Sequence, residues 1–325
     1  MDILTTVLAS MRTGRPAAVR TEAQAPWGLR FRQIAGAGFH VVLHGTCWLI
    51  APEGAPQHTP IALSPGDVVF LRSGRGHILA DDPGSPVEDF KPEHREQSSP
   101  IGTIRIAGRG GPRVSLLCGA YQLDLAGPHP LLRDLPEIVH LPARHGRRST
   151  LSSTIDLLGA ELEDPRPGSD GIIAALIDAL LLYVLRAWLD DQPQATPEGW
   201  AAALTDPAIA VALLAIHREP AHGWTVETLG RQASMSRAAF ARRFTALVGE
   251  PPLAYLTRWR MIVAAQLLRD TDATLSAIAV RTGYASEYAV GKAFKRAYGM
   301  PPSAYRNDRS RAVPETPDVD WAASP

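Results

Sequence analysis

A repeat with an offset of fifty residues, in the C-terminal part of this 325-residue chain, limits the possible folds more than any other feature. Between residues 236 and 255, identical residues recur at eight positions, and Arg242 recurs as Lys292. The eight pairs are Ser236 and Ser286, Ala239 and Ala289, Phe244 and Phe294, Gly249 and Gly299, Pro251 and Pro301, Pro252 and Pro302, Ala254 and Ala304, and Tyr255 and Tyr305. This agreement indicates two copies of one supersecondary unit.

Each copy predicts a short helix, a tight turn and a second helix. The first helices are expected at 226–233 and 275–282, and Ser236 and Ser286 can cap the second helices. This order is that of a helix-turn-helix. A continuous helical pattern at 252–268, about 25 Å long at 1.5 Å per residue, is expected to fix the distance between the two units.

The second helix of each copy has an apolar face and an outward face. Spacing predicts that Phe240, Phe244 and Leu247 point inward in the first copy, and Val290, Phe294 and Ala297 in the second. Small outward residues would let a helix backbone approach base edges in the major groove of DNA. The predicted base-facing residues are Arg237, Ala238, Ala241, Arg242, Glu287, Tyr288, Gly291 and Lys292, and the predicted phosphate contacts are Arg243, Lys295 and Arg296.

The chemistry of these side chains suggests what each would contact. Arg242 can bind guanine through two hydrogen bonds, Glu287 can accept a hydrogen bond from cytosine, and Tyr288 can contact a thymine methyl group or a phosphate. Most protein–DNA hydrogen bonds reach the sugar–phosphate backbone of the DNA. For four other residues, a phosphate contact and a base contact therefore remain alternatives. These are Arg237, Arg243, Lys295 and Arg296.

The distribution of charge supports a nucleic-acid partner. The formal net charge of the chain is zero, but residues 207–311 carry 15 Lys and Arg against 7 Asp and Glu, a local charge of +8. A basic part beside an acidic part suits a protein that places one half on phosphate.

Two segments together resemble the AraC/XylS DNA-binding domain over about 206–306. They are TLGRQASMSRAAFARRFTALVGEPPLAYLTRWRMIVAAQLLRD and LSAIAVRTGYASEYAVGKAFKRAYGMPPSAYR. The resemblance implies double-stranded DNA as partner. It also implies base contacts from Ala238, Ala241, Arg242, Glu287, Tyr288, Gly291 and Lys292. The two alanines depart from the larger residues of some members, so the first unit is expected to depend on Arg242 and on DNA shape. We expect this domain at 206–311 and a loose tail at 312–325.

Short apolar runs punctuated by Gly, Pro and Asp up to residue 141 predict a strand-rich domain, either a β-barrel or a β-sandwich. GDVVFLRSGRGHILAD resembles the second cupin motif, with Gly66, Gly74 and His77 in place, and FHVVLHGTCWL and LLCGAYQLDL resemble cupin-type sensor domains. The resemblance implies a sensor barrel at 1–141. The chain as a whole is therefore expected to be α+β, with this barrel and a C-terminal all-α domain.

Four residues of this domain are candidates for an effector pocket or a metal site: His40, His44, His77 and Cys118. His40 and His44 share a face of a regular strand, with Cys47 on the other face. Because the full first cupin motif is absent, we favour pocket filling or effector binding, and we assign no metal or other cofactor. Cys47 and Cys118 lack any short metal-ligand spacing and are expected to be buried thiols.

Residues 142–192 predict a helical pair, with helices at 150–163 and 171–189, and residues 193–205 a linker. The second helix is apolar around most of its circumference, so packing on the barrel and a homodimer interface are alternatives. No run of about 18 apolar residues is free of charge, and the N-terminal residues do not resemble a secretory signal. We therefore expect a cytoplasmic protein without a membrane partner.

These features together predict a sequence-specific DNA-binding transcriptional regulator that responds to a small effector in the barrel, and not an enzyme. RNA polymerase is the expected protein partner, and activation and repression both stay open. The alternative is a metal-dependent cupin enzyme with an accessory DNA-binding module, since cupin barrels carry many functions.

Overall fold

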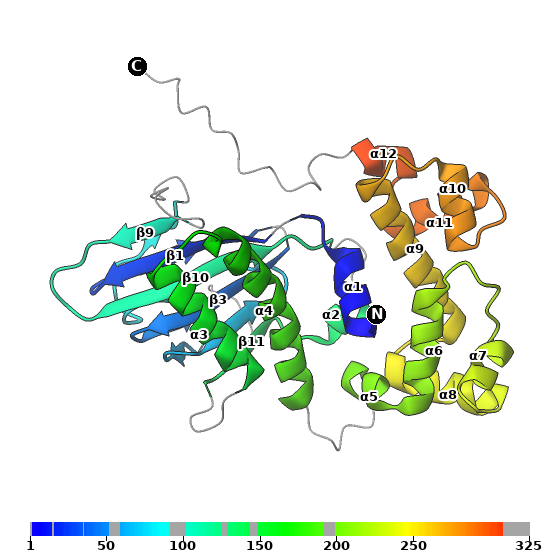
Figure 1. The fold of residues 1–325 in the computed structure, drawn as a ribbon, viewed down its shortest axis with the longest axis horizontal. Helices are drawn as coiled ribbons and strands as arrows, with labels where there is room; N and C mark the ends of the chain where they lie inside the picture. The colour runs from blue at the N-terminus through cyan, green and yellow to red at the C-terminus, as the bar shows by residue number, and fades with distance from the viewer. Residues whose placement is uncertain are drawn as a thin grey trace. The chain divides into compact units, whose positions relative to one another are not determined.

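The computed structural model describes residues 2–14, 16–34, 36–51, 59–91, 102–124, 129–143, 149–191 and 199–307. The chain divides into two compact units (Figure 1). The sheet unit comprises Arg15–Gln122 and Leu135–Asp191, and the helical unit comprises Met1–Gly14, Leu123–Asp134 and Gln192–Pro325. This division differs from the continuous domains expected from sequence, because two segments from the first 141 residues pack with the C-terminal helices.

The strands of the sheet unit form two sheets. One has six strands in the order β11-β6-β3-β10-β1-β9, and the other has five in the order β5-β4-β7-β2-β8. Among the described residues no ladder joins the two, so the predicted barrel is an open pair of sheets and not a closed cylinder. The strands are β1 (Ala17–Gln24), β2 (Gly28–Phe31), β3 (Ala37–His44), β4 (Cys47–Ile50), β5 (Ile61–Leu63), β6 (Val68–Leu71), β7 (His77–Ala80), β8 (Glu88–Asp89), β9 (Thr103–Ile106), β10 (Arg113–Tyr121) and β11 (Ile138–Leu141).

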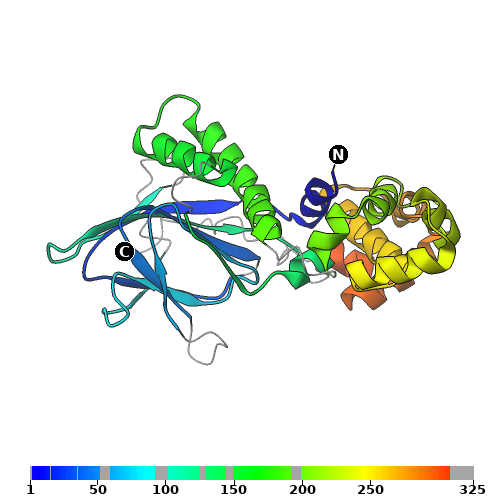
Figure 2. The same cartoon turned by 90° about the horizontal axis from the view of Figure 1, so that it is seen from below.

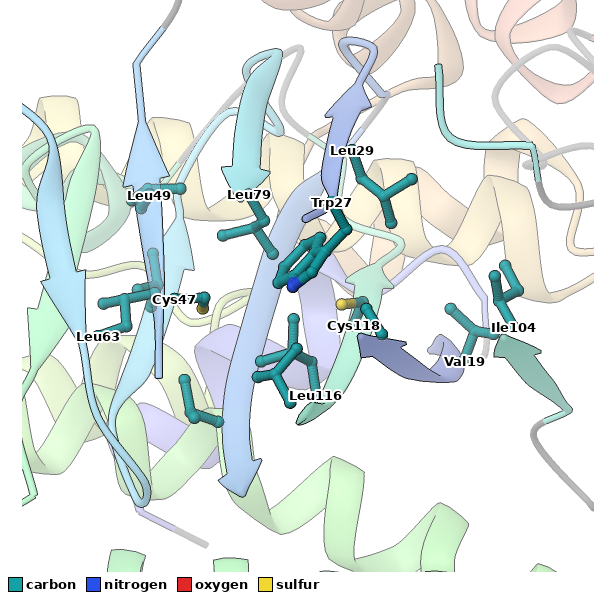
Figure 3. Packing of buried hydrophobic residues seen from close by; sticks show 14 of the residues in the cluster. Val19, Trp27, Leu29, Cys47, Leu49, Leu63, Leu79, Ile104, Leu116 and Cys118 are labelled. Carbon is teal, nitrogen blue, oxygen red and sulfur yellow. The ribbon is translucent and has the colours of Figure 1, made fainter. Parts of the chain in front are cut away.

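The core of the sheet unit is apolar and lies between the sheets. Strand β1 alternates buried and half-buried residues, as expected for a strand with one face in the core. Figure 3 shows Trp27, Leu79, Leu116 and Cys118 directed toward one another in this core. Cys47 and Cys118 are both buried free thiols, as predicted, and burial raises the pKa of each to about 12.

The predicted helical pair is α3 (Thr150–Glu163) and α4 (Ser169–Asp191), and it lies against the six-stranded sheet (Figure 2). The hydroxyl of Tyr121 in β10 donates to the carbonyl of Ile177 in α4 at 2.7 Å. Helix α4 is long and apolar enough to cross a membrane by composition, and 33% of its most apolar stretch is buried in the fold. The predicted packing of the pair on the sheet is confirmed, and the homodimer interface stays a prediction.

The helical unit contains both predicted helix-turn-helix units. The first consists of α7 (Val226–Gln232) and α8 (Arg237–Val248), and the second of α10 (Leu275–Thr282) and α11 (Glu287–Tyr298). Helix α9 (Pro252–Asp270) joins them, as predicted (Figure 1). The other helices are α1 (Ile3–Met11), α2 (Pro130–Asp134), α5 (Trp200–Thr205), α6 (Pro207–Arg218) and α12 (Pro302–Asn307).

Two details of this unit correct the sequence analysis. Helix α5 lies inside the expected linker, and its Trp200 is 1% exposed, so part of that segment belongs to the core. In α11, Ala297 is exposed and not inward, and the neighbouring Tyr298 is buried in its place. Tyr298 stacks on Phe294 at 4.5 Å between ring centroids, which a small alanine could not do.

Candidate nucleic-acid interface

Local hydrogen bonds and turns set the start of each recognition helix. Ser236 and Ser286 cap α8 and α11 by accepting from the backbone N–H of Ala239 and Ala289, at 3.3 and 3.2 Å. The preceding turns use left-handed backbone, at Ser234 in the first unit and at Gly283 in the second. Gly283 has φ +72°, and a Cβ there would lie 2.7 Å from the carbonyl oxygen of Ala221, so this turn requires glycine.

The outward face of α8 is accessible as predicted. Arg237, Ala238 and Arg242 are exposed, and Ala241 is half-buried between them. Arg243 differs, because its guanidinium forms an ion pair with Asp206, whose carboxylate also caps α6. We therefore expect Arg242, and not Arg243, to have the freer guanidinium of the two.

The outward face of α11 has the same arrangement. Tyr288 is 78% exposed, Glu287 and Lys292 are exposed, and Gly291 is half-buried. The two predicted phosphate contacts, Lys295 and Arg296, lie exposed in the last turn. Both copies thus present a small residue flanked by long polar side chains.

The two recognition helices are supported in equivalent ways. Phe244 of α8 packs edge-on against Tyr255 at 5.8 Å between ring centroids, and Phe294 of α11 packs in the same way on Tyr305 at 5.1 Å. These four aromatic residues are two of the pairs that recur at the fifty-residue offset. The repeat in the sequence is therefore also a repeat in the core.

In the sheet unit, two of the four candidate pocket residues meet. The Nε2 atoms of His40 and His77 lie 2.6 Å apart, both rings are buried, and the Phe31 ring stacks on that of His77. Nδ1 of His77 bonds to the carbonyl oxygen of Arg75 at 2.9 Å, so it must carry a proton. In the neutral pair, Nε2 of His40 therefore donates to Nε2 of His77, and Nδ1 of His40 is left as an acceptor.

Burial keeps this pair neutral. It lowers the pKa of His77 to about 4 and holds the pKa of His40 well below its ordinary value, with the neighbouring ring adding to the effect on His40. Nδ1 of His40 is buried without a hydrogen-bond partner among the described residues. A buried acceptor of this kind costs free energy until a donor reaches it.

Of the other two candidates, Cys118 lies beside His40 on the neighbouring strand β10, and His44 lies apart from the pair. The expected shared face for His40 and His44 is wrong: a register shift opposite Ser115 and Leu116 interrupts the alternation of β3, and His44 is 64% exposed beside Glu163 of α3. Cys118 pairs with His40 across the sheet, and the hydroxyl of Thr21 lies 3.8 Å from its sulfur. Within the described ranges, no three His, Cys, Asp or Glu side chains are grouped closely enough to bind a metal.

Comparison with known proteins finds one N-terminal and one C-terminal family match. A family model described as Cupin matches residues 2–190, and one described as Helix-turn-helix domain matches residues 229–308. The DNA-binding domain of AdpA, solved in complex with a target DNA, matches with 35% sequence identity and a TM-score of 0.32, covering 34% of this chain and 99% of that one.

Full-length relatives are named for regulation of transcription. A Streptomyces lividans protein named as an AraC-like transcription regulator is 39% identical over 308 residues, covering 94% of this chain and 98% of the relative. The HTH-type transcriptional regulator AlkR of Acinetobacter baylyi is 30% identical over 319 residues, covering 94% and 99%. These names do not favour the alternative of a cupin enzyme. The chain belongs to the AraC-like family of DNA-binding transcriptional regulators, with an N-terminal cupin domain and a C-terminal helix-turn-helix domain.

Proposed function

We propose that this regulator binds a double-stranded DNA site with two short sequence blocks, one for α8 and one for α11. The two exposed, equivalent helix faces on either side of α9 support this proposal most directly. Recognition helices joined in this way are expected to enter successive major grooves, about 10 bp apart. Exposed Lys295 and Arg296 would hold the second helix on the phosphates.

Selection of genome fragments by the purified full-length protein, at near-physiological salt, tests this proposal. The affinity for the recovered sequence is then compared with that for a scrambled sequence. We expect two blocks about one helical turn apart, bound about 10³-fold or more tighter than the scramble. Binding without sequence preference would contradict the proposed site.

Arg242 is the residue of the first unit that we expect to read a base. Replacing Arg242 by Ala should cost about 1–3 kcal/mol of binding free energy and relax the preference at one base pair. Arg242→Lys is the matched control, because lysine keeps the positive charge but cannot donate two hydrogen bonds in the bidentate geometry of a guanidinium. Binding measured against every base at that position checks the prediction, and an equal loss on all sequences would make Arg242 a phosphate contact.

We also propose that a small effector acts at the His40–His77 pair. The unpaired Nδ1 acceptor of His40, among apolar and aromatic neighbours, suits an apolar molecule that carries one hydroxyl or N–H donor. An effector with different affinity for two arrangements of the protein would change DNA occupancy. The test is an effector screen by thermal shift, with His40→Phe expected to abolish the shift.

We propose that the histidine pair functions without a resident metal ion. Zinc–nitrogen bonds of about 2.0–2.1 Å at a tetrahedral angle place two ligand nitrogens about 3.3 Å apart. The 2.6 Å between the Nε2 atoms is shorter than this and corresponds to a short direct hydrogen bond. Metal analysis of the purified protein is expected to find no stoichiometric metal, and iron, manganese or zinc at one per chain would contradict this proposal.

We further propose that the protein acts in the cytoplasm and contacts RNA polymerase, as its class of function requires. A homodimer formed through α3 and α4 is part of the same proposal, since Leu157 and Ile172 are exposed on this pair. Sedimentation of the purified protein at micromolar concentration tests the dimer, and a monomer at all concentrations would contradict it.

A further inference from the structure

The segment between β10 and β11 supplies two residues, Asp124 and His129, that contact the two repeats. Each contacts one repeat, and the tyrosines that they contact are equivalent in the repeat. Tyr255 and Tyr305 are equivalent in the fifty-residue repeat, and both rings are buried. The Tyr305 hydroxyl donates to the carboxylate of Asp124, and Nε2 of His129 lies 2.8 Å from the Tyr255 hydroxyl. All four residues belong to the helical unit.

Asp124 is part of a buried charged cluster at the C-terminal end of α9. Arg269 donates to Asp124 at 3.2 Å and to the Tyr305 hydroxyl at 2.9 Å, and it also donates to the carbonyl oxygen of Ser10 at the end of α1. The side chains of Arg269 and Asp124 are only 11% and 9% exposed. Asp124 is therefore bound to the second repeat by a charge-assisted network.

His129 is part of a directional hydrogen-bond chain at the other end of α9. The N–H of Leu131 donates to Nδ1 of His129 at 3.2 Å, so Nε2 carries the proton and donates to the Tyr255 hydroxyl. That hydroxyl in turn donates to Nε2 of His217 in α6 at 2.5 Å. Burial raises the pKa of Tyr255 well above its ordinary value, which keeps its hydroxyl protonated for this donation.

Each tyrosine supports a recognition helix directly. Tyr255 packs on Phe244 of α8, and Tyr305 packs on Phe294 of α11, both edge-on. A displacement of either tyrosine would thus move the recognition helix beside it, because close-packed aromatic rings transmit small shifts.

The covalent length between the two binding residues limits their separation. Five residue steps reach at most about 18 Å, whereas the fourteen α9 steps from Tyr255 to Arg269 rise about 21 Å. The side chains must supply the difference. The chain between Asp124 and His129 therefore connects the support of α8 with the support of α11 through five residue steps, in addition to the connection through α9.

We propose that Asp124 and His129 are positioning residues that fix the placement of α8 relative to α11, and so determine which spacing between two DNA blocks the protein accepts. This inference rests on the proposed two-block site. The recognition helices alone would not select one spacing between the two DNA blocks. In this inference, residues that do not contact DNA determine that spacing.

Tyrosine-to-phenylalanine variants test the inference with little change in packing. The Tyr255→Phe/Tyr305→Phe double variant removes both hydroxyls, and Tyr183→Phe in α4 of the sheet unit is the matched control. The probes are the DNA duplex selected by the unsubstituted protein, the same duplex with one base pair added or removed between the blocks, and each block alone. One base pair rotates the second block by about 35° around the duplex.

We expect the unsubstituted protein and Tyr183→Phe to lose about tenfold or more in affinity when the spacing changes by one base pair, but the double variant to lose less than about threefold. Affinity for each block alone should stay within about twofold, which shows that the helices still fold and read. If the double variant does not fold, Tyr255→Phe takes its place with the same expectation, because it removes the hydroxyl that His129 binds and keeps the Asp124 network on the second repeat.

Two outcomes would overturn the inference alone. The variants could keep the full spacing preference, or they could lose affinity equally on every probe, single blocks included, as for a purely structural role. If the unsubstituted protein instead bound all three spacings with equal affinity, the two-block site would be refuted, and the inference with it.

Discussion

Replacing Asp124 by Ala is expected to lower the free energy of unfolding of the helical unit by about 3–5 kcal/mol, because it leaves the buried Arg269 without its carboxylate. The Arg269 side chain is 11% exposed, so water cannot replace the lost partner fully. The Tyr305 hydroxyl loses its acceptor at the same time. Denaturant unfolding, followed by hydrogen exchange in peptides of α9 and α12, measures the loss.

The matched control is the Asp124→Ala/Arg269→Met double variant. Removal of both charges takes away the uncompensated ion, so the double variant should be more stable than Asp124→Ala by about 1–4 kcal/mol. Arg166→Ala removes the exposed ion pair with Asp164 and should leave the free energy of unfolding almost unchanged, because solvent screens this pair. An equally small effect of Asp124→Ala on the free energy of unfolding would show that the Asp124–Arg269 pair contributes little to the fold.

Acidification is expected to destabilise both units well before ordinary carboxylates titrate. Burial lowers the pKa of His77 to about 4 and that of His217 to about 3, from an ordinary value of 6.5. Between these values and 6.5 the unfolded chain binds more protons than the folded one, so stability falls as the pH falls. For His77 the loss begins near pH 6.5, is complete below pH 4, and amounts to about 3 kcal/mol.

Free energies of unfolding at pH 7.0, 5.5 and 4.5 check this expectation. The His40→Leu/His77→Leu variant should lose less stability over this range than the unsubstituted protein, because its sheet unit no longer holds two neutral imidazoles in the core. Hydrogen exchange in β3 and β7 peptides assigns the effect to the sheet unit. His44→Gln, at an exposed position, is the single-histidine control, and an equal pH slope in the unsubstituted protein and the leucine variant would contradict the prediction.

The histidine chain through Tyr255 links acid sensitivity to the helical unit as well. His129 and His217 are held neutral by burial, and each is bonded to the Tyr255 hydroxyl. Arg258 and Arg133 also lower the pKa of His129, whereas Glu250 raises that of Tyr255. Protonation of either imidazole would place a cation in a core of aromatic rings, so the contact of His129 with the first repeat depends on neutral pH.

Sequence alone determined the helical core of this regulator. The repeat, the capping serines at 236 and 286, and the helical pattern after Pro252 predicted α8, α9 and α11 correctly, because these signals depend on neighbours within a few turns. Their outward residues followed from the 3.6-residue period. The period failed only at Ala297, where the larger Tyr298 fills the space beside Phe294.

Only the tertiary structure decided which distant residues meet. Alternation in a regular strand places His40 and His44 together, but a single shift of register against β10 separates them, and no local pattern signals that shift. The partners of His40 and Tyr255 lie 37 residues away at His77 and 126 residues away at His129. Such contacts are set by how sheets and helices pack on one another, and the residues that form them need no periodic pattern in the sequence.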